Sequence, residues 1–133
     1  MDQTSQARDE LDLLGRSLRR QLVALITDLT VRVHLRRLSL DEPKIASFQP
    51  LRHHYAAEYQ GKRPATTTAA ETAARATSAL RSAGWNVTTS QEDDDGVLWT
   101  VIAAHRDGSH IHVLTGKATL TVVFRGRTPE RAL

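Results

Sequence analysis

Apolar and polar residues alternate along residues 84–125, and this alternation predicts β-strands. The dipeptide Asp107-Gly108 stands between two apolar runs. It is a strong signal for a two-residue type I′ hairpin, because both central positions of that turn have positive φ. With this turn in place, His105 pairs with His110 across the hairpin. The pattern therefore predicts a four-strand antiparallel meander over residues 84–125.

The predicted pairings sort the meander's side chains into two faces, since successive residues of a strand point to opposite sides. A further turn at Gly116-Lys117 would pair Leu114 with Thr119. The first face is almost wholly apolar and is the expected core face; it carries Leu98, Ile102, Ala104, Ile111, Val113, Leu120, Val122 and Phe124. The second face is mixed and carries Trp99, Val101, His105, His110, His112, Leu114, Thr119, Thr121 and Val123.

Two helices are expected before the meander, both on its core face. Residues 7–29 carry leucines at spacings of three and four, which is typical of one face of an amphipathic helix. We expect this stripe to pack on the sheet, with coiled-coil self-pairing as the alternative. The second helix covers residues 68–83, because Thr68 and Glu71 make a capping box and Gly84 suits the position after the helix.

The remaining segments are shorter or less regular. Residues 30–36 alternate between polar and apolar, which favours a strand, with a continued helix as the alternative. Residues 41–65 contain three prolines and are expected to form an irregular connection, with a short helical turn near the middle. The predicted fold class is α+β, in one domain over residues 1–133. It combines an N-terminal amphipathic helix, a capped helix and the four-strand meander.

Composition excludes several function classes. The 133 residues include no cysteine, which rules out disulfides, thiol catalysis and cysteine-bound zinc. The first ten residues are polar and acidic, unlike a signal peptide, and no apolar run approaches the roughly 20 residues of a membrane span. A cytoplasmic protein is therefore expected. No nucleotide-binding loop or nucleophile motif occurs, so we predict no cofactor, and the balance is against an enzyme.

Charge is distributed unevenly, although the formal net charge is only +3. The acidic run 92–95 is expected to be a solvated hairpin loop. The segment 16–37, by contrast, holds six arginines and one acid. Arginine suits the planar recognition of phosphate or carboxylate, although coding bias would produce the same excess. The candidate contacts with phosphates or an acidic partner are Arg16, Arg19, Arg20, Arg32, Arg36 and Arg37.

Three histidines form the best candidate for chemistry. His110 and His112 share one face of a strand, and His105 lies opposite His110 across the hairpin. Three imidazole nitrogens on one face can ligate a metal and leave a position for water. The simpler interpretation is that they are exposed polar residues at a hairpin tip, with no carboxylate placed to orient them.

The mixed second face determines the expected function. Two helices on one sheet face leave the other face partly apolar, and such a surface often marks an association site. We therefore expect a non-catalytic interaction module that forms a homo-oligomer, most simply a homodimer, and binds an unidentified protein partner. A nucleic-acid-binding protein acting through the arginines is the first alternative, and a histidine-ligated metal site is the second. The expected interaction face is made by Trp99, Val101, Leu114 and Val123.

Overall fold

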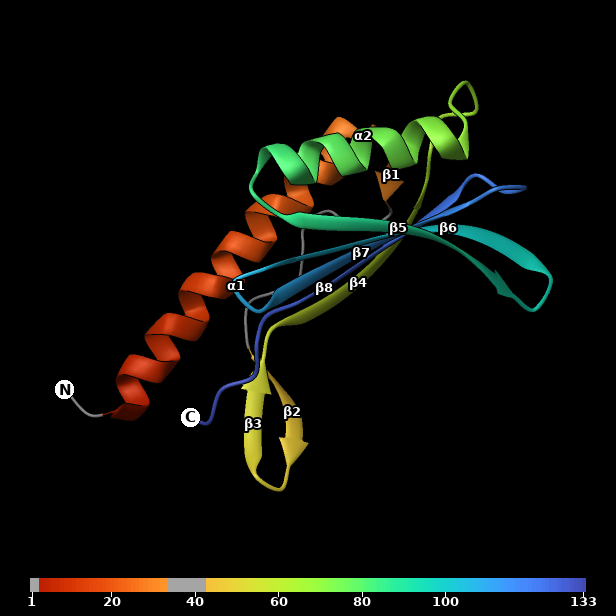
Figure 1. Ribbon diagram of the computed structural model, residues 1–133. Helices are drawn as coiled ribbons and strands as arrows, with labels where there is room; N and C mark the ends of the chain where they lie inside the picture. The colour runs from red at the N-terminus through yellow and green to blue at the C-terminus, as the bar shows by residue number, and fades with distance from the viewer. Residues whose placement is uncertain (1–2, 34–42) are drawn as a thin grey trace.

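The structure is a computed structural model that describes residues 3–33 and 43–133. Two helices and eight strands follow one another along these residues (Figure 1). They are α1 (Gln3–Asp28), β1 (Arg32–Val33), β2 (Lys44–Phe48), β3 (Leu51–His54), β4 (Ala56–Lys62), α2 (Ala69–Ser82), β5 (Asn86–Asp94), β6 (Val97–Arg106), β7 (Ser109–Gly116) and β8 (Thr121–Arg127). None of the helices in this part of the chain is long and apolar enough to cross a membrane.

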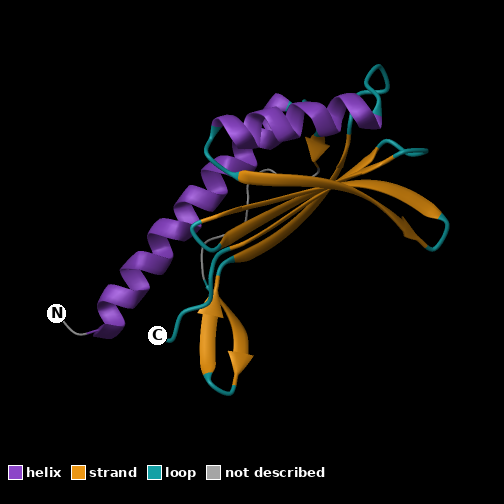
Figure 2. Cartoon of the chain, in the orientation of Figure 1, coloured by secondary structure: helices purple, strands orange, loops and turns teal. Residues whose placement is uncertain are grey.

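Six strands form one antiparallel sheet in the order β1-β4-β8-β7-β6-β5, and β2 and β3 form a separate two-stranded sheet. Both helices lie on the same side of the large sheet (Figures 1 and 2). The α+β class is therefore confirmed. The sheet is larger than the predicted four strands, because β4 and β1 extend the meander beyond β8.

The first hairpin of the meander has the predicted register. His105 pairs with His110, and the turn residues Asp107 and Gly108 have φ of 51° and 80°. Positive φ at both positions is what a type I′ turn requires. The hairpin between β5 and β6 turns in the same way at Asp95 and Gly96, with φ of 54° and 81°.

The predicted register of the last hairpin is wrong. Leu114 pairs with Val123 rather than with Thr119, because residues 117–120 form a longer connection than the two-residue turn expected at Gly116-Lys117. The error is a shift of four residues. Because four is an even number, the side chains of β8 keep their predicted faces, whereas Thr119 and Leu120 lie in the connection and belong to neither face.

The expected irregular connection over residues 41–65 is also wrong. Residues 44–62 form three strands, and the predicted helical turn is part of β3 and β4. β4 pairs with β8 along its whole length, from Ala56 opposite Arg127 to Lys62 opposite Thr121. Of the strand expected at residues 30–36, Arg32–Val33 form β1, residues 30 and 31 lie before it outside any strand, and residues 34–36 lie outside the described residues.

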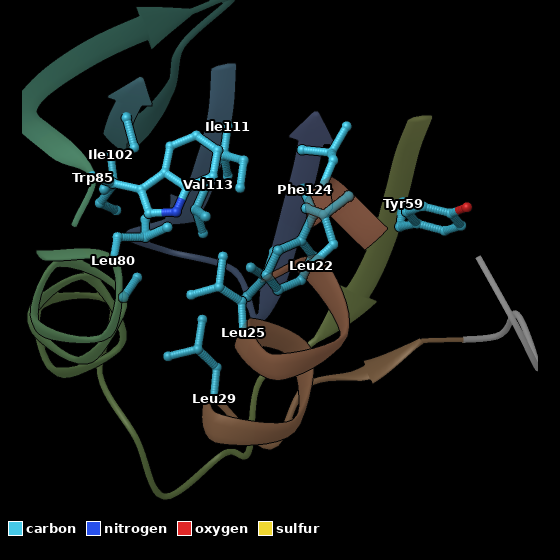
Figure 3. Packing of buried hydrophobic residues seen from close by; sticks show 14 of the residues in the cluster. Leu22, Leu25, Leu29, Tyr59, Leu80, Trp85, Ile102, Ile111, Val113 and Phe124 are labelled. Carbon is cyan, nitrogen blue, oxygen red and sulfur yellow. The ribbon is translucent and has the colours of Figure 1, made fainter. Parts of the chain in front are cut away.

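The core lies between the helices and the sheet, where α1 contributes its leucine stripe (Figure 3). Leu18 and Leu22 reach Gly126 of β8, where a Cβ atom would meet their methyl groups at 3.1 and 3.0 Å. The missing side chain lets the helix approach the sheet. The stripe therefore packs on the sheet, as expected. Its fully buried members, each at most 2% exposed, are Leu11, Leu18, Leu22, Leu25 and Leu29.

The ends of α2 follow the capping signals. The Thr68 hydroxyl accepts a hydrogen bond from the Glu71 backbone N–H at 3.0 Å. At the other end Gly84 has φ of 86°, and the Trp85 N–H donates to the Leu80 carbonyl at 3.0 Å. This pattern closes the last turn of a helix and satisfies its free carbonyl groups. Trp85 then enters the core beside Leu80 (Figure 3).

Candidate interaction site

The sheet face that points away from both helices is called the open face. Its centre is a row of three apolar side chains that lie next to one another across the strands: Val101, Leu114 and Val123. Val101 and Val123 are buried by their neighbours, while Leu114 and the nearby Trp99 are half-buried. All four residues predicted for the interaction face therefore share it. The alternation of β6, β7 and β8 accounts for this result.

A groove of about 990 Å³ lies over one end of the open face. Trp99, Leu114 and Val123 form part of its floor, and the outer end of the β5–β6 hairpin forms one wall. That wall is acidic, since it includes Glu92, Asp93 and Asp94. These three acids belong to β5, and of the acidic run 92–95 only Asp95 lies in the hairpin turn, which corrects the expectation of a loop.

The hairpin made by β2 and β3, residues 44–54, is called the arm. It projects away from the helices and the large sheet (Figure 1). Its apolar side chains are unusually exposed, with 76% of the surface of Phe48 accessible, 49% of Ile45 and 48% of Leu51. At its base, His53 exchanges two backbone hydrogen bonds of 2.8 Å with Arg131. The arm is thus anchored at its base, while its tip is exposed.

The three histidines lie on the open face, as predicted. The rings of His105 and His110 have centroids 6.2 Å apart, and His112 lies two residues further along β7. Burial is the main cause that lowers the pKa of both His110 and His112, and the positive charge of Arg127 lowers both further. Among the described residues, no group of three histidine, aspartate or glutamate side chains is arranged to hold a metal ion. The structure adds no support for the predicted metal site at the three histidines, which stays a prediction.

The arginines predicted to bind phosphate lie on separate elements. Arg16, Arg19 and Arg20 are on α1, and Arg32 is on β1 at the edge of the sheet. Arg36 and Arg37 fall outside the described residues. A different basic group occurs on the open face, where Arg125 and Arg127 lie beside the histidines. The sequence held the signal for it, because residues 125–127 continue the alternation of β8.

The chain was compared with family models, with curated proteins and with solved structures, and none of them matches it. The features of the molecule that bear on its function are therefore the arm, the groove and the basic residues of the open face.

Proposed function

We propose that the protein is a non-catalytic interaction module that self-associates in the cytoplasm, with the arm of one copy docked in the groove of another. The observation that carries this proposal is the exposed apolar tip of the arm. Phe48 and Leu51 pair with each other at the tip, and both are exposed. A two-stranded hairpin is marginally stable by itself in water, so burial of its apolar side chains would stabilise it.

The groove suits this arm in polarity and in charge. Its floor offers Trp99 and Leu114 as apolar contacts, and its lining carries three acids against two basic residues, Lys117 and Arg125. The arm carries Lys44 and Arg52 and contains no acidic residue. Apolar side chains with basic neighbours would thus meet an apolar floor with an acidic wall. Such charge complementarity favours the encounter and fixes its orientation.

The positions of the arm and the groove favour a contact between copies. The arm joins the large sheet where β4 begins, at Ala56, whereas the groove reaches β4 only at Gln60 and extends to the far edge of the sheet. Figure 1 shows the arm below the large sheet and the outer end of the β5–β6 hairpin at the right, at separate places. Two copies related by a two-fold axis could exchange arms, which would bury both tips and close the assembly as a dimer.

The expected contribution of the arm to the free energy of dimerisation follows from the exposed fraction of Phe48. Full burial of a phenylalanine contributes up to about 3 kcal/mol, so burying the 76% that is exposed contributes about 2 kcal/mol. A two-fold dimer makes the contact twice. Phe48→Ser should therefore weaken dimerisation by about 4 kcal/mol, or roughly a thousandfold in Kd.

Sedimentation equilibrium of the parent and of Phe48→Ser tests the proposal, with Leu13→Ser as the matched control. Leu13 is 58% exposed on α1 and belongs to neither the arm nor the lining of the groove, so its substitution removes apolar surface of similar extent at another place. We expect a dimer for the parent and for Leu13→Ser, and a monomer for Phe48→Ser. A parent that is monomeric at every concentration refutes the proposal, and a monomeric Leu13→Ser assigns the interface to α1 instead.

Mixing two variants tests the exchange itself. Trp99→Ser damages the groove and leaves the arm intact, whereas Phe48→Ser does the reverse. Each should be monomeric alone. A mixture should form a heterodimer held by one intact arm in one intact groove, at an affinity between those of the parent and of either variant. Failure of this mixture to associate while the parent dimerises would show that the arm and the groove do not bind each other.

A further inference from the structure

A second pocket, of about 340 Å³, lies on the open face near the base of the arm and is called the basic pocket. Four of its side chains form a square on two neighbouring strands. Arg127 lies opposite His110, and Arg125 lies opposite His112. Lys44 of the arm adds a third fixed positive charge, and Glu58 of β4 is the pocket's one acid.

The charges of the basic pocket do not balance. Glu58 makes an ion pair with Arg125, with 3.1 Å between the carboxylate oxygen and Nε. Within the described part of the chain, neither Arg127 nor Lys44 has an acidic partner. Two positive charges are therefore left over, beside two histidines that can gain protons. A protonated His110 opposite Arg127 would place like charges across neighbouring strands, and a bound anion would offset their repulsion.

We infer that the basic pocket binds the phosphate group of a small phosphate monoester. The excess of two charges matches a phosphate dianion. The planar guanidinium of Arg127 can donate two parallel hydrogen bonds to phosphate oxygens, which is the strongest form of this contact. The pocket is larger than one oxyanion requires, and the rest of its wall is made by small residues, Ala56, Ala57 and Gly126. A small organic group can lie against that wall.

The histidines make this binding depend on pH. In the absence of an anion, burial and Arg127 lower the pKa of both His110 and His112, so both are neutral at pH 7. A bound dianion favours their protonated forms and raises both pKa values, so binding is coupled to proton uptake. The other charged or titratable groups near the pair are His105 of β6, Glu58, Lys44, Arg125 and Glu92, which raises the pKa of His112. Beside Lys44 and Arg127 there are also His54, whose pKa is lowered by burial and then by both of them, and Glu130, which raises it.

Calorimetric titrations with sulfate, inorganic phosphate and ribose 5-phosphate test this inference. Sulfate keeps its double charge, so its affinity should rise as the pH falls from 7.5 to 5.5, by up to roughly tenfold per pH unit for each histidine that takes up a proton. Ribose 5-phosphate becomes a monoanion below a pKa of about 6, so its affinity should level off there. Inorganic phosphate loses its second charge at a higher pH, so its affinity should level off earlier. Tighter binding of ribose 5-phosphate than of phosphate assigns the organic ester as the ligand; equal binding assigns free phosphate.

Two substitutions locate the site. Arg127→Gln should weaken sulfate binding by roughly tenfold or more, because it removes a charge-assisted contact. Arg81→Gln is the matched control, since Arg81 is also exposed but lies on α2, across the sheet. Both variants should keep the parent's circular dichroism spectrum and Tm. Equal losses in the two variants, or sulfate affinity that is flat with pH, would overturn the inference.

One further titrant separates a small-ligand site from a nucleic-acid surface. A single-stranded oligonucleotide series should bind no more tightly than the monoester, whatever its length. Affinity that grows with length, together with a steep salt dependence, would assign the open face to nucleic acid and refute the monoester site.

Discussion

Gly15 lies in the middle of α1, and replacing it by alanine should destabilise the protein. In most helices the same change stabilises by about 1 kcal/mol, because alanine is the better helix former. Here a Cβ atom at residue 15 would lie 2.7 Å from Cδ2 and 2.9 Å from Cε2 of the Tyr55 ring. Real Cβ atoms essentially never approach other heavy atoms so closely. Either the ring or the helix must therefore move.

Tyr55 is held too firmly to move without loss. Its hydroxyl donates to Oδ1 of Asp12 at 2.6 Å, and its backbone N–H donates to Oγ1 of Thr128 at 2.9 Å. Its side chain is also buried, at 4% exposed. Overpacking of this kind costs about 1–3 kcal/mol, and the firm anchoring places it in the upper half of that range. After the gain in helix propensity, the net loss for Gly15→Ala is about 1–2 kcal/mol.

Thermal melts of four proteins measure this effect: the parent, Gly15→Ala, Tyr55→Leu and the double variant. For a chain of this size the Tm of Gly15→Ala should fall by about 3–8 °C. In the Tyr55→Leu background the ring is absent, so the same change should raise the Tm instead. The reversal is the decisive result, because a double-mutant cycle isolates the contact between the two residues. A Gly15→Ala variant that is more stable than the parent would falsify the close contact between the Tyr55 ring and α1.

Two other predictions concern the end of α2 and the open face. Gly84→Val should lower the free energy of unfolding by about 1 kcal/mol or more, since a β-branched residue is strained at φ of 86°. Gly84→Asn should lose less stability, because asparagine tolerates this conformation. Coinciding thermal melts of the parent and Gly84→Val would contradict the assigned end of α2. The second prediction is that His112 makes stability depend on pH. Its pKa in the folded protein is below the ordinary value of 6.5, so the unfolded chain binds more protons than the folded protein between these two pKa values. The free energy of unfolding should therefore decline as the pH falls through 6.5 toward the folded pKa. In buffers free of phosphate and sulfate, His112→Gln should flatten this decline in a urea-melt series, and an unchanged slope would contradict it.

Local signals in the sequence were enough for the features that local chemistry determines. Asp107-Gly108 fixed one hairpin register, because few dipeptides favour positive φ at both positions. The same logic gave both ends of α2, where Thr68 and Gly84 act within a few residues of themselves. The connection after Gly116 gave no such signal, so its length and the register of β8 were misjudged.

Pairing between distant segments could not be predicted in this way. Tyr55, Ala57, Tyr59 and Gly61 alternate as a strand should, and their polar neighbours face the open side. The three prolines of residues 41–65 led to the expectation of an irregular connection. What makes β4 a strand is its partner β8, more than 50 residues away along the chain. A pattern within one segment contains no information about that partner.

The candidate site was predicted in part for the same reason. Alternation placed Trp99, Val101, Leu114 and Val123 on one face, and it placed the three histidines there as well. It gave no indication of the arm, whose strands pair only with each other. It also did not bring Lys44 and Glu58 to Arg125 and Arg127, because those residues meet only when β4 joins β8.

The packing of α1 against Gly126 has a consequence for synthesis of the chain. The ribosome makes the leucine stripe of α1 first, but the strand on which Leu18 and Leu22 pack, β8, is the last to emerge. About 100 residues separate the two, which corresponds to roughly 5–20 s at ordinary rates of translation. Throughout that interval Leu18 and Leu22 lack the strand on which they pack, although α2 and Tyr55, which also contact α1, emerge earlier. A nascent chain stalled before β8 should therefore bind chaperones that recognise apolar helices, and release of the complete chain should end that binding.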